Sequence, residues 1–74
     1  MNKVRFAIVG YGWRAATWIR IARLCPDFFE VTACVVRSRE RADEVMAAQA
    51  ALGQPVLATD NLEEALATNP DFVL

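Results

Sequence analysis

Residues 4–15 read Val-Arg-Phe-Ala-Ile-Val-Gly-Tyr-Gly-Trp-Arg-Ala, an apolar run that leads directly into a glycine-rich turn. The β-branched and aromatic residues of this run predict a strand from Lys3 to Val9. The segment from Trp13 to Leu24 carries apolar residues at helical spacing and stops before Pro26. A Gly-x-Gly-x-x-Ala turn therefore joins a strand to a helix, which is the context that makes this pattern specific.

Three small residues of that turn each meet a geometric need. Gly10 permits the tight turn, Gly12 lets the backbone approach a pyrophosphate, and Ala15 lets the helix pack closely on the strand. The N–H groups of Trp13 and Arg14 lie in the first helical turn, where the helix dipole also favours anions. The Arg14 side chain either adds a direct contact or lies exposed. We therefore expect this turn to bind the phosphates of a dinucleotide.

The composition is that of one small globular unit. The chain has 74 residues, of which 55% are hydrophobic and 23% charged, with a net charge of -1. This balance gives no reason to expect nucleic acid or a membrane surface as a partner. The N-terminus lacks a signal-peptide layout, and no apolar stretch approaches the roughly 18 to 20 residues that cross a bilayer. We expect a cytoplasmic protein.

The cysteines and the lack of histidine restrict the chemistry. With two cysteines and no histidine, a zinc site or a Cys–His nucleophile has too few parts. We expect Cys25 to end the first helix and Cys34 to be a buried strand residue. Acid–base catalysis by a histidine of this chain is excluded.

The remaining sequence continues the alternation of strands and helices. Further strands are predicted at 31–36, 55–58 and 71–74, and further helices at 39–52 and 62–67. The predicted caps are Ser38 and Gly53 for the second helix and a capping box of Asn61 and Glu64 for the third. The apolar stripe of the second helix would place four residues in the core: Ala42, Val45, Met46 and Ala50. The fold class is therefore α/β, a partial doubly wound Rossmann sheet of about four parallel strands in the order 3-2-1-4 with three helices. The first two helices should cover one face and the third the other.

A fourth strand that ends at Leu74 would leave an apolar strand edge uncovered. We therefore expect residues 1–74 to be the first half of a nucleotide-binding domain within a longer protein. The same edge invites pairing with another strand, so we also expect homo-oligomers.

The end of the second predicted strand indicates which dinucleotide is bound. NAD-binding versions of the motif place an acidic residue about 20 positions after the glycines. This chain instead has Arg37, Ser38 and Arg39, whose guanidinium and hydroxyl groups suit a 2′-phosphate. NADP(H) is therefore favoured, and NAD(H) stays possible. The alternative is a solvated arginine loop neutralised by nearby acidic residues, Glu40, Asp43 and Glu44.

Taken together, these residues resemble the glucose–fructose oxidoreductase/inositol dehydrogenase family. The similarity covers essentially the whole chain: the strand and glycine turn over residues 3–12, Val35 to Ser38 with Glu40 to Ala42, and Asn61 to Leu66 before Pro70 to Val73. The chain departs from the common NAD-type pattern of that family at Arg37 and at Ala15.

The resemblance implies a two-domain NAD(P)-dependent oxidoreductase that acts on a sugar, a cyclitol or a related small metabolite. Its catalytic lysine and substrate domain would lie beyond Leu74, so we expect the 74-residue chain alone to be inactive. Two other functions stay open at this point. One is a non-catalytic nucleotide-sensing Rossmann module, and the less favoured one is a methyltransferase that binds adenosylmethionine.

Overall fold

The structure is a computed structural model that describes residues 3–74. Its four strands are β1 (Val4–Val9), β2 (Phe29–Val35), β3 (Ala58–Thr59) and β4 (Phe72–Val73), and its three helices are α1 (Trp13–Leu24), α2 (Arg39–Ala51) and α3 (Leu62–Leu66). All strand pairs are parallel, and the strand order is β3-β2-β1-β4. The described chain is thus α/β with a partial Rossmann-like sheet, as predicted.

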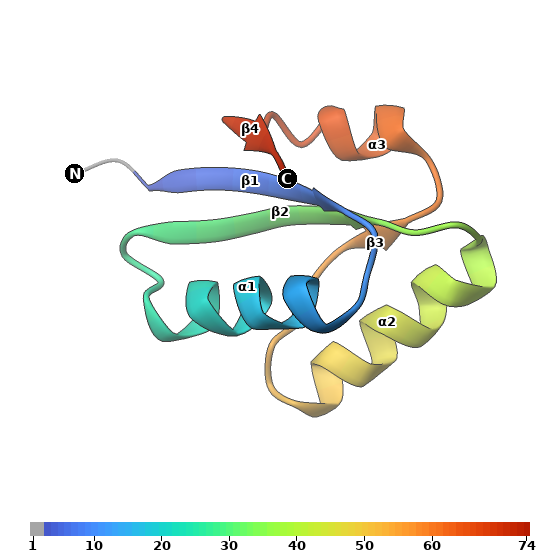
Figure 1. Cartoon of the computed structure of the whole chain (residues 1–74), viewed down its shortest axis with the longest axis horizontal. Coiled ribbons are helices and arrows are strands. Elements are labelled where there is room, and N and C mark those ends of the chain that lie inside the picture. Colours follow the sequence, from blue (N-terminus) through green and yellow to red (C-terminus); the bar gives the residue numbers. More distant parts are fainter. Residues whose placement is uncertain (1–2) are drawn as a thin grey trace.

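The helices are divided between the two faces of the sheet as the sequence predicts. Helices α1 and α2 lie on one face, and α3 lies on the other, where it contacts β2 and β3 (Figure 1). Strands β1 and β2 run parallel, so their carboxyl ends meet at one edge of the sheet. The Gly10 N–H donates to the Val35 carbonyl oxygen across 2.7 Å, which fixes the glycine turn beside the end of β2.

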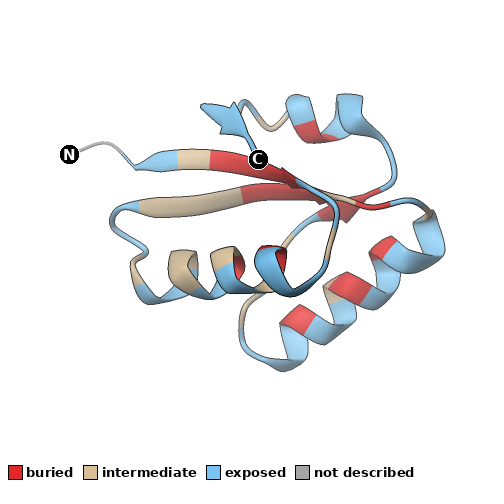
Figure 2. Cartoon of the chain, viewed as in Figure 1, coloured by how far each residue is buried: buried red, intermediate tan, exposed pale blue. Residues whose placement is uncertain are grey.

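The core lies where α1 and α2 cover the middle of the sheet (Figure 2). Phe6 of β1 is 1% exposed, and its ring packs edge-on against Trp18 and stacks on Phe72. The centroid distances are 5.8 and 5.5 Å, respectively. This one side chain therefore connects helix α1 to the edge strand β4, and burying it favours folding by about 2 kcal/mol.

The buried stripe of α2 differs from the prediction at one position. Ala42 and Val45 are buried as predicted and Met46 is half-buried, but Ala50 is exposed. Gln49 is buried in its place. A glutamine can occupy this core position because its amide forms two hydrogen bonds inside the protein, so burial leaves no polar atom without a partner.

Most predicted element boundaries agree with the structure within two residues, and the third strand is the exception. It is predicted to begin at Pro55 but joins the ladder only at Ala58. Proline has no N–H to donate to a neighbouring strand, so the segment before Ala58 only approaches the sheet.

The predicted caps are found at both ends of α2. Ser38 Oγ accepts from the Arg41 N–H at 3.1 Å. Gly53 has a φ of +73° and ends the helix in a Schellman motif, in which its N–H and that of Gln54 donate to the Ala50 and Gln49 carbonyls.

The predicted capping box of α3 forms only in part. Asn61 Oδ1 accepts from the N–H groups of Glu63 and Glu64, as predicted. The Glu64 carboxylate does not return to the Asn61 N–H, because the Thr59 hydroxyl lies between them. That hydroxyl accepts from the Asn61 N–H at 3.1 Å and donates to Glu64 at 2.7 Å. Thr59 therefore has a local structural role.

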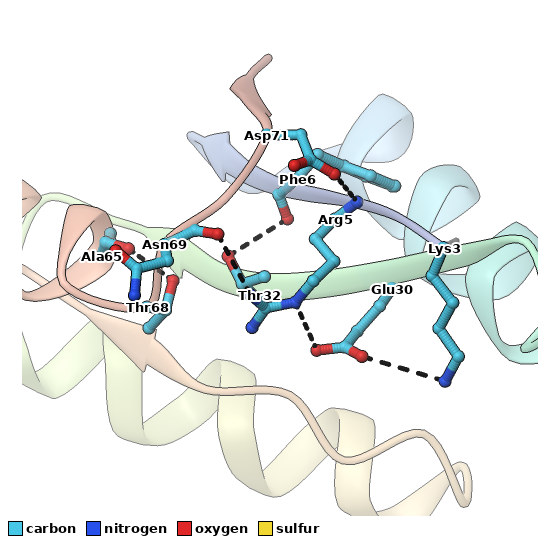
Figure 3. Close-up of polar contacts among 9 residues, drawn as sticks. All are labelled: Lys3, Arg5, Phe6, Glu30, Thr32, Ala65, Thr68, Asn69 and Asp71. Atoms are coloured by element: carbon cyan, nitrogen blue, oxygen red, sulfur yellow. Dashed lines mark hydrogen bonds and ion pairs between the residues drawn. The ribbon is translucent and has the colours of Figure 1, made fainter. Parts of the chain in front are cut away.

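A cluster of polar contacts near the amino ends of β1 and β2 holds residues 69–71 against β1 (Figure 3). The Arg5 guanidinium donates to Glu30 of β2 at 3.2 Å and to the Asn69 carbonyl at 3.1 Å. The Arg5 N–H donates to the Asp71 carboxylate at 2.8 Å. Asn69 has a φ of +56°, which is a left-handed conformation. Because the Asn69 carbonyl accepts from Arg5, this side chain helps to hold the turn before β4.

Replacement of Arg5 with Met should therefore lower the free energy of unfolding by about 1 kcal/mol, because two side-chain hydrogen bonds are lost. Urea denaturation followed by circular dichroism measures this change. The matched control is Arg20→Met on the exposed side of α1, which should unfold as wild type does. Equal losses in the two variants would contradict this role of Arg5.

Candidate functional site

Two hollows of 730 and 710 Å³ lie at the carboxyl edge of the sheet and share Val9, Gly10 and Tyr11 as lining residues. The first, called here the β2 hollow, is also lined by Val35, Val36, Arg37, Ser38, Glu40, Arg41 and Glu44. The second, the α1 hollow, is also lined by Ile8, Gly12, Trp13, Arg14, Ala15, Trp18 and Leu74. The two hollows adjoin at these three shared residues, and the pair is called here the groove.

The two glycines of the turn differ in what requires them. Gly10 has a φ of +93°, which residues with a side chain rarely adopt. Gly12 has φ −157° and ψ −156°, an extended conformation open to other residues, and a Cβ there would meet no atom within 4 Å. Neither backbone conformation nor internal packing accounts for the glycine at position 12. A glycine at this position leaves the surface of the α1 hollow open.

Helix α1 begins at this glycine without a side-chain cap. Its first hydrogen bond runs from the Ala16 N–H to the Gly12 carbonyl at 3.0 Å. Within residues 3–74, the N–H groups of Trp13, Arg14 and Ala15 therefore have no acceptor. In α2 and α3, by contrast, Ser38 and Asn61 cap the first turn. These N–H groups belong to residues that line the α1 hollow, and N–H groups at a helix start can bind an anion.

The residues predicted to bind from this helix take different positions. Trp13 is 85% exposed and Arg14 is exposed, so neither side chain is fixed by the core. Ala15 is 5% exposed and packs in the core cluster with Phe6 and Ile8. It acts by letting the helix approach the strand closely, as the sequence pattern predicts.

The three residues predicted at the end of β2 are only partly brought together. Arg37 and Ser38 line the β2 hollow, whereas Arg39 does not. Ser38 Oγ already accepts from the backbone as the α2 cap, so its hydroxyl offers a ligand its proton and one remaining lone pair. Arg41, which the sequence analysis did not include in the site, lines the hollow instead.

Arg41 contacts the ring of Tyr11 beside the β2 hollow. The guanidinium carbon of Arg41 is 5.4 Å from the centroid of the Tyr11 ring, a cation–π contact that joins α2 to the glycine turn. Sequence reasoning missed Tyr11 because the position between the two glycines is variable in the motif. The signal in the sequence was Gln49, a polar residue at helical spacing from Ala42 and Val45. A glutamine on that buried face needs a hydrogen-bond partner, which is Tyr11.

The charges of the β2 hollow are balanced. Arg37 and Arg41 line it together with Glu40 and Glu44, and Arg41 forms an ion pair of 3.7 Å with Glu44. Arg37 has no ion pair with the described residues. An anion entering the hollow therefore meets one unengaged guanidinium, and a second that is shared with an exposed carboxylate.

Cys34 lies under the glycine turn. Its thiol is fully buried and donates to the Gly10 carbonyl at 3.3 Å. Burial raises the pKa of the Cys34 thiol to about 11, against a smaller lowering by Arg41. The thiol therefore stays protonated at neutral pH and supports the turn as a donor. Cys25 is the C-cap residue of α1 and is partly exposed.

Searches of the chain against family models, curated proteins and solved structures returned no match. The chemistry of the groove therefore rests on the residues described above. No helix within residues 3–74 combines the length and the apolar character needed to span a bilayer.

At pH 8, Cys34 should react with iodoacetamide far more slowly than Cys25, because its thiol is buried and its pKa is about 11. Raising the pH to 10 should leave most Cys34 thiols protonated, since that pH is still below the pKa. Mass spectrometry of Cys25→Ala and Cys34→Ala variants separates the two sites. Rapid native labelling of Cys34, as fast as in urea, would disagree with this placement.

Proposed function

We propose that this chain binds a dinucleotide, NADP(H) in preference to NAD(H), in the groove at the carboxyl edge of the sheet. The observation that carries the proposal is the start of α1. Three N–H groups without acceptors lie beside Gly12, where the protein has no atom within 4 Å of a side-chain position. Helix N-termini bind phosphates through such groups, and a glycine at this point admits the close contact.

The lining residues of the two hollows suit the two parts of such a ligand. The α1 hollow offers backbone donors to the pyrophosphate, and the β2 hollow accepts the adenosine end beside Val35 and Val36. Both include Gly10, so a ligand that bridges them crosses directly over the turn. This placement agrees with the general location of ligands in open parallel sheets, outside the carboxyl ends of the strands.

Arg37 supports NADP(H) over NAD(H). It lines the β2 hollow without an ion-pair partner among the described residues, and its planar guanidinium matches a phosphate in two parallel hydrogen bonds. Glu40 and Glu44 oppose a phosphate, but Glu44 is paired with Arg41. A bound 2′-phosphate would form an ion pair with Arg37 and would compete with Glu44 for Arg41.

The wider proposal is that the chain is the nucleotide-binding half of an oxidoreductase that acts on a sugar, a cyclitol or a similar metabolite. It rests on the resemblance to the glucose–fructose oxidoreductase/inositol dehydrogenase family. NADP(H), when bound, would supply or accept the hydride. The described residues would hold its phosphates and adenosine, and substrate selection would need further residues.

Replacement of Gly12 with Val tests phosphate binding at the turn. The variant should lose at least about tenfold in affinity for NADP and ADP, because the side chain occupies the approach to the α1 N–H groups. Its free energy of unfolding should stay within about 1 kcal/mol of wild type, since the extended backbone accepts a side chain. Titrations followed by ¹⁵N NMR, with urea denaturation, measure both quantities.

The ligand control is adenosine 2′-phosphate, which lacks the pyrophosphate and should bind Gly12→Val as it binds wild type. The intermediate variant Gly12→Ala should fall between the two in NADP affinity. If wild type binds neither NADP nor ADP, the proposed function is wrong.

Replacement of Arg37 with Asp should shift the preference from NADP toward NAD. A carboxylate repels the 2′-phosphate and accepts from ribose hydroxyls, so NADP affinity should fall by roughly 10- to 100-fold. The matched control is Arg39→Asp, because Arg39 lies outside the lining of the β2 hollow. An unchanged NADP/NAD affinity ratio in Arg37→Asp would contradict the cofactor assignment.

A further inference from the structure

We propose that Tyr11 is a positioning residue that holds the glycine turn in its phosphate-binding geometry, through a hydrogen bond from Gln49 of α2. This inference rests on the proposed function and adds to it a residue that the glycine pattern leaves unspecified. Tyr11 lies on the turn between Gly10 and Gly12 and lines both hollows.

The turn needs an anchor because glycines stand on both sides of Tyr11. Glycine has the widest backbone freedom of any residue, so two of them leave the segment poorly restrained by its own dihedral angles. Gly10 is tied at its N–H to Val35 and at its carbonyl to the Cys34 thiol. Among the described residues, the next backbone hydrogen bond along the chain is the one that Gly12 accepts from Ala16. Between these points the Tyr11 side chain makes the connection to the rest of the protein.

The Tyr11 hydroxyl is the end of a partly buried side-chain relay. The Gln54 amide donates to Gln49 Oε1 at 2.8 Å, and Gln49 Nε2 donates to the Tyr11 hydroxyl. Gln49 is 2% exposed, and both ends of its amide are engaged, which fixes the orientation of the group. Gln54 is itself held by its N–H in the Schellman motif that ends α2. The relay therefore begins just after the end of α2 and ends on the glycine turn.

The relay acts on the glycine turn and not on the adenosine end of the groove. Arg41 rests on the face of the Tyr11 ring, a contact that does not need the hydroxyl. We expect the hydroxyl to restrain the turn and the helix start that follows it, and the ring to keep its contact with Arg41 without the hydroxyl. Loss of the hydroxyl alone should thus weaken ligands that carry a pyrophosphate and leave ligands of the β2 hollow unaffected.

The test is Tyr11→Phe in the 74-residue chain, titrated with NADP, ADP and adenosine 2′-phosphate by ¹⁵N NMR. We expect a loss of roughly five- to tenfold for NADP and ADP, as for one lost hydrogen bond, and a change below about twofold for adenosine 2′-phosphate. Gln49→Met removes the partner and keeps the tyrosine, so it should give the same pattern if Tyr11→Phe folds poorly. The double variant should lose no more than either single variant.

The control is Thr32→Val, which removes a buried hydroxyl that donates to the Phe6 carbonyl at 3.4 Å, away from the groove. It should lower stability without changing any of the three affinities. Wild-type affinity of Tyr11→Phe for NADP and ADP would overturn the inference, and so would an equal loss for adenosine 2′-phosphate. Both results differ from failure of the proposed function, in which wild type itself binds neither NADP nor ADP.

Discussion

The parallel pairing of β1 with β2 is the constraint on which the rest of this structure depends. Its last contact, the 2.7 Å hydrogen bond from the Gly10 N–H to the Val35 carbonyl, holds the two strand ends side by side. Because the strands run in the same direction, the turns that follow them leave at the same edge. Residues 27 positions apart, such as Gly10 and Arg37, thereby line one hollow.

The three helices differ in how their first turns are capped. In α2 the Ser38 side chain accepts from the Arg41 N–H, and in α3 Asn61 accepts from the N–H groups of Glu63 and Glu64. Helix α1 begins with Gly12, which has no side chain to cap it. An uncapped start is less stable than a capped one, but it keeps donors free for an anion. The candidate site lies where this uncapped helix start meets the carboxyl edge of the parallel sheet.

Local patterns predicted the elements well and their long-range partners poorly. The apolar strands, the caps Ser38 and Gly53 and the order of the sheet follow from residue types and spacing, because backbone propensities and crossover handedness act locally. Periodicity alone placed Ala50 in the core, where Gln49 lies instead, because the amide finds Tyr11 across the fold. The Glu64 side chain likewise bonds to Thr59, a partner that the capping pattern does not include.

The sequence by itself determined that this chain forms an alternating α/β sheet with a glycine turn at its first strand–helix junction, since these features arise from neighbouring residues. Only the tertiary structure decided which side chains gather around that turn. Helix α2 presents Arg41 and Gln49 to Tyr11 and leaves Arg39 outside the hollow, because the helix packs through Ala42 and Val45. The angle of each residue around a helix is known only once its buried face is fixed.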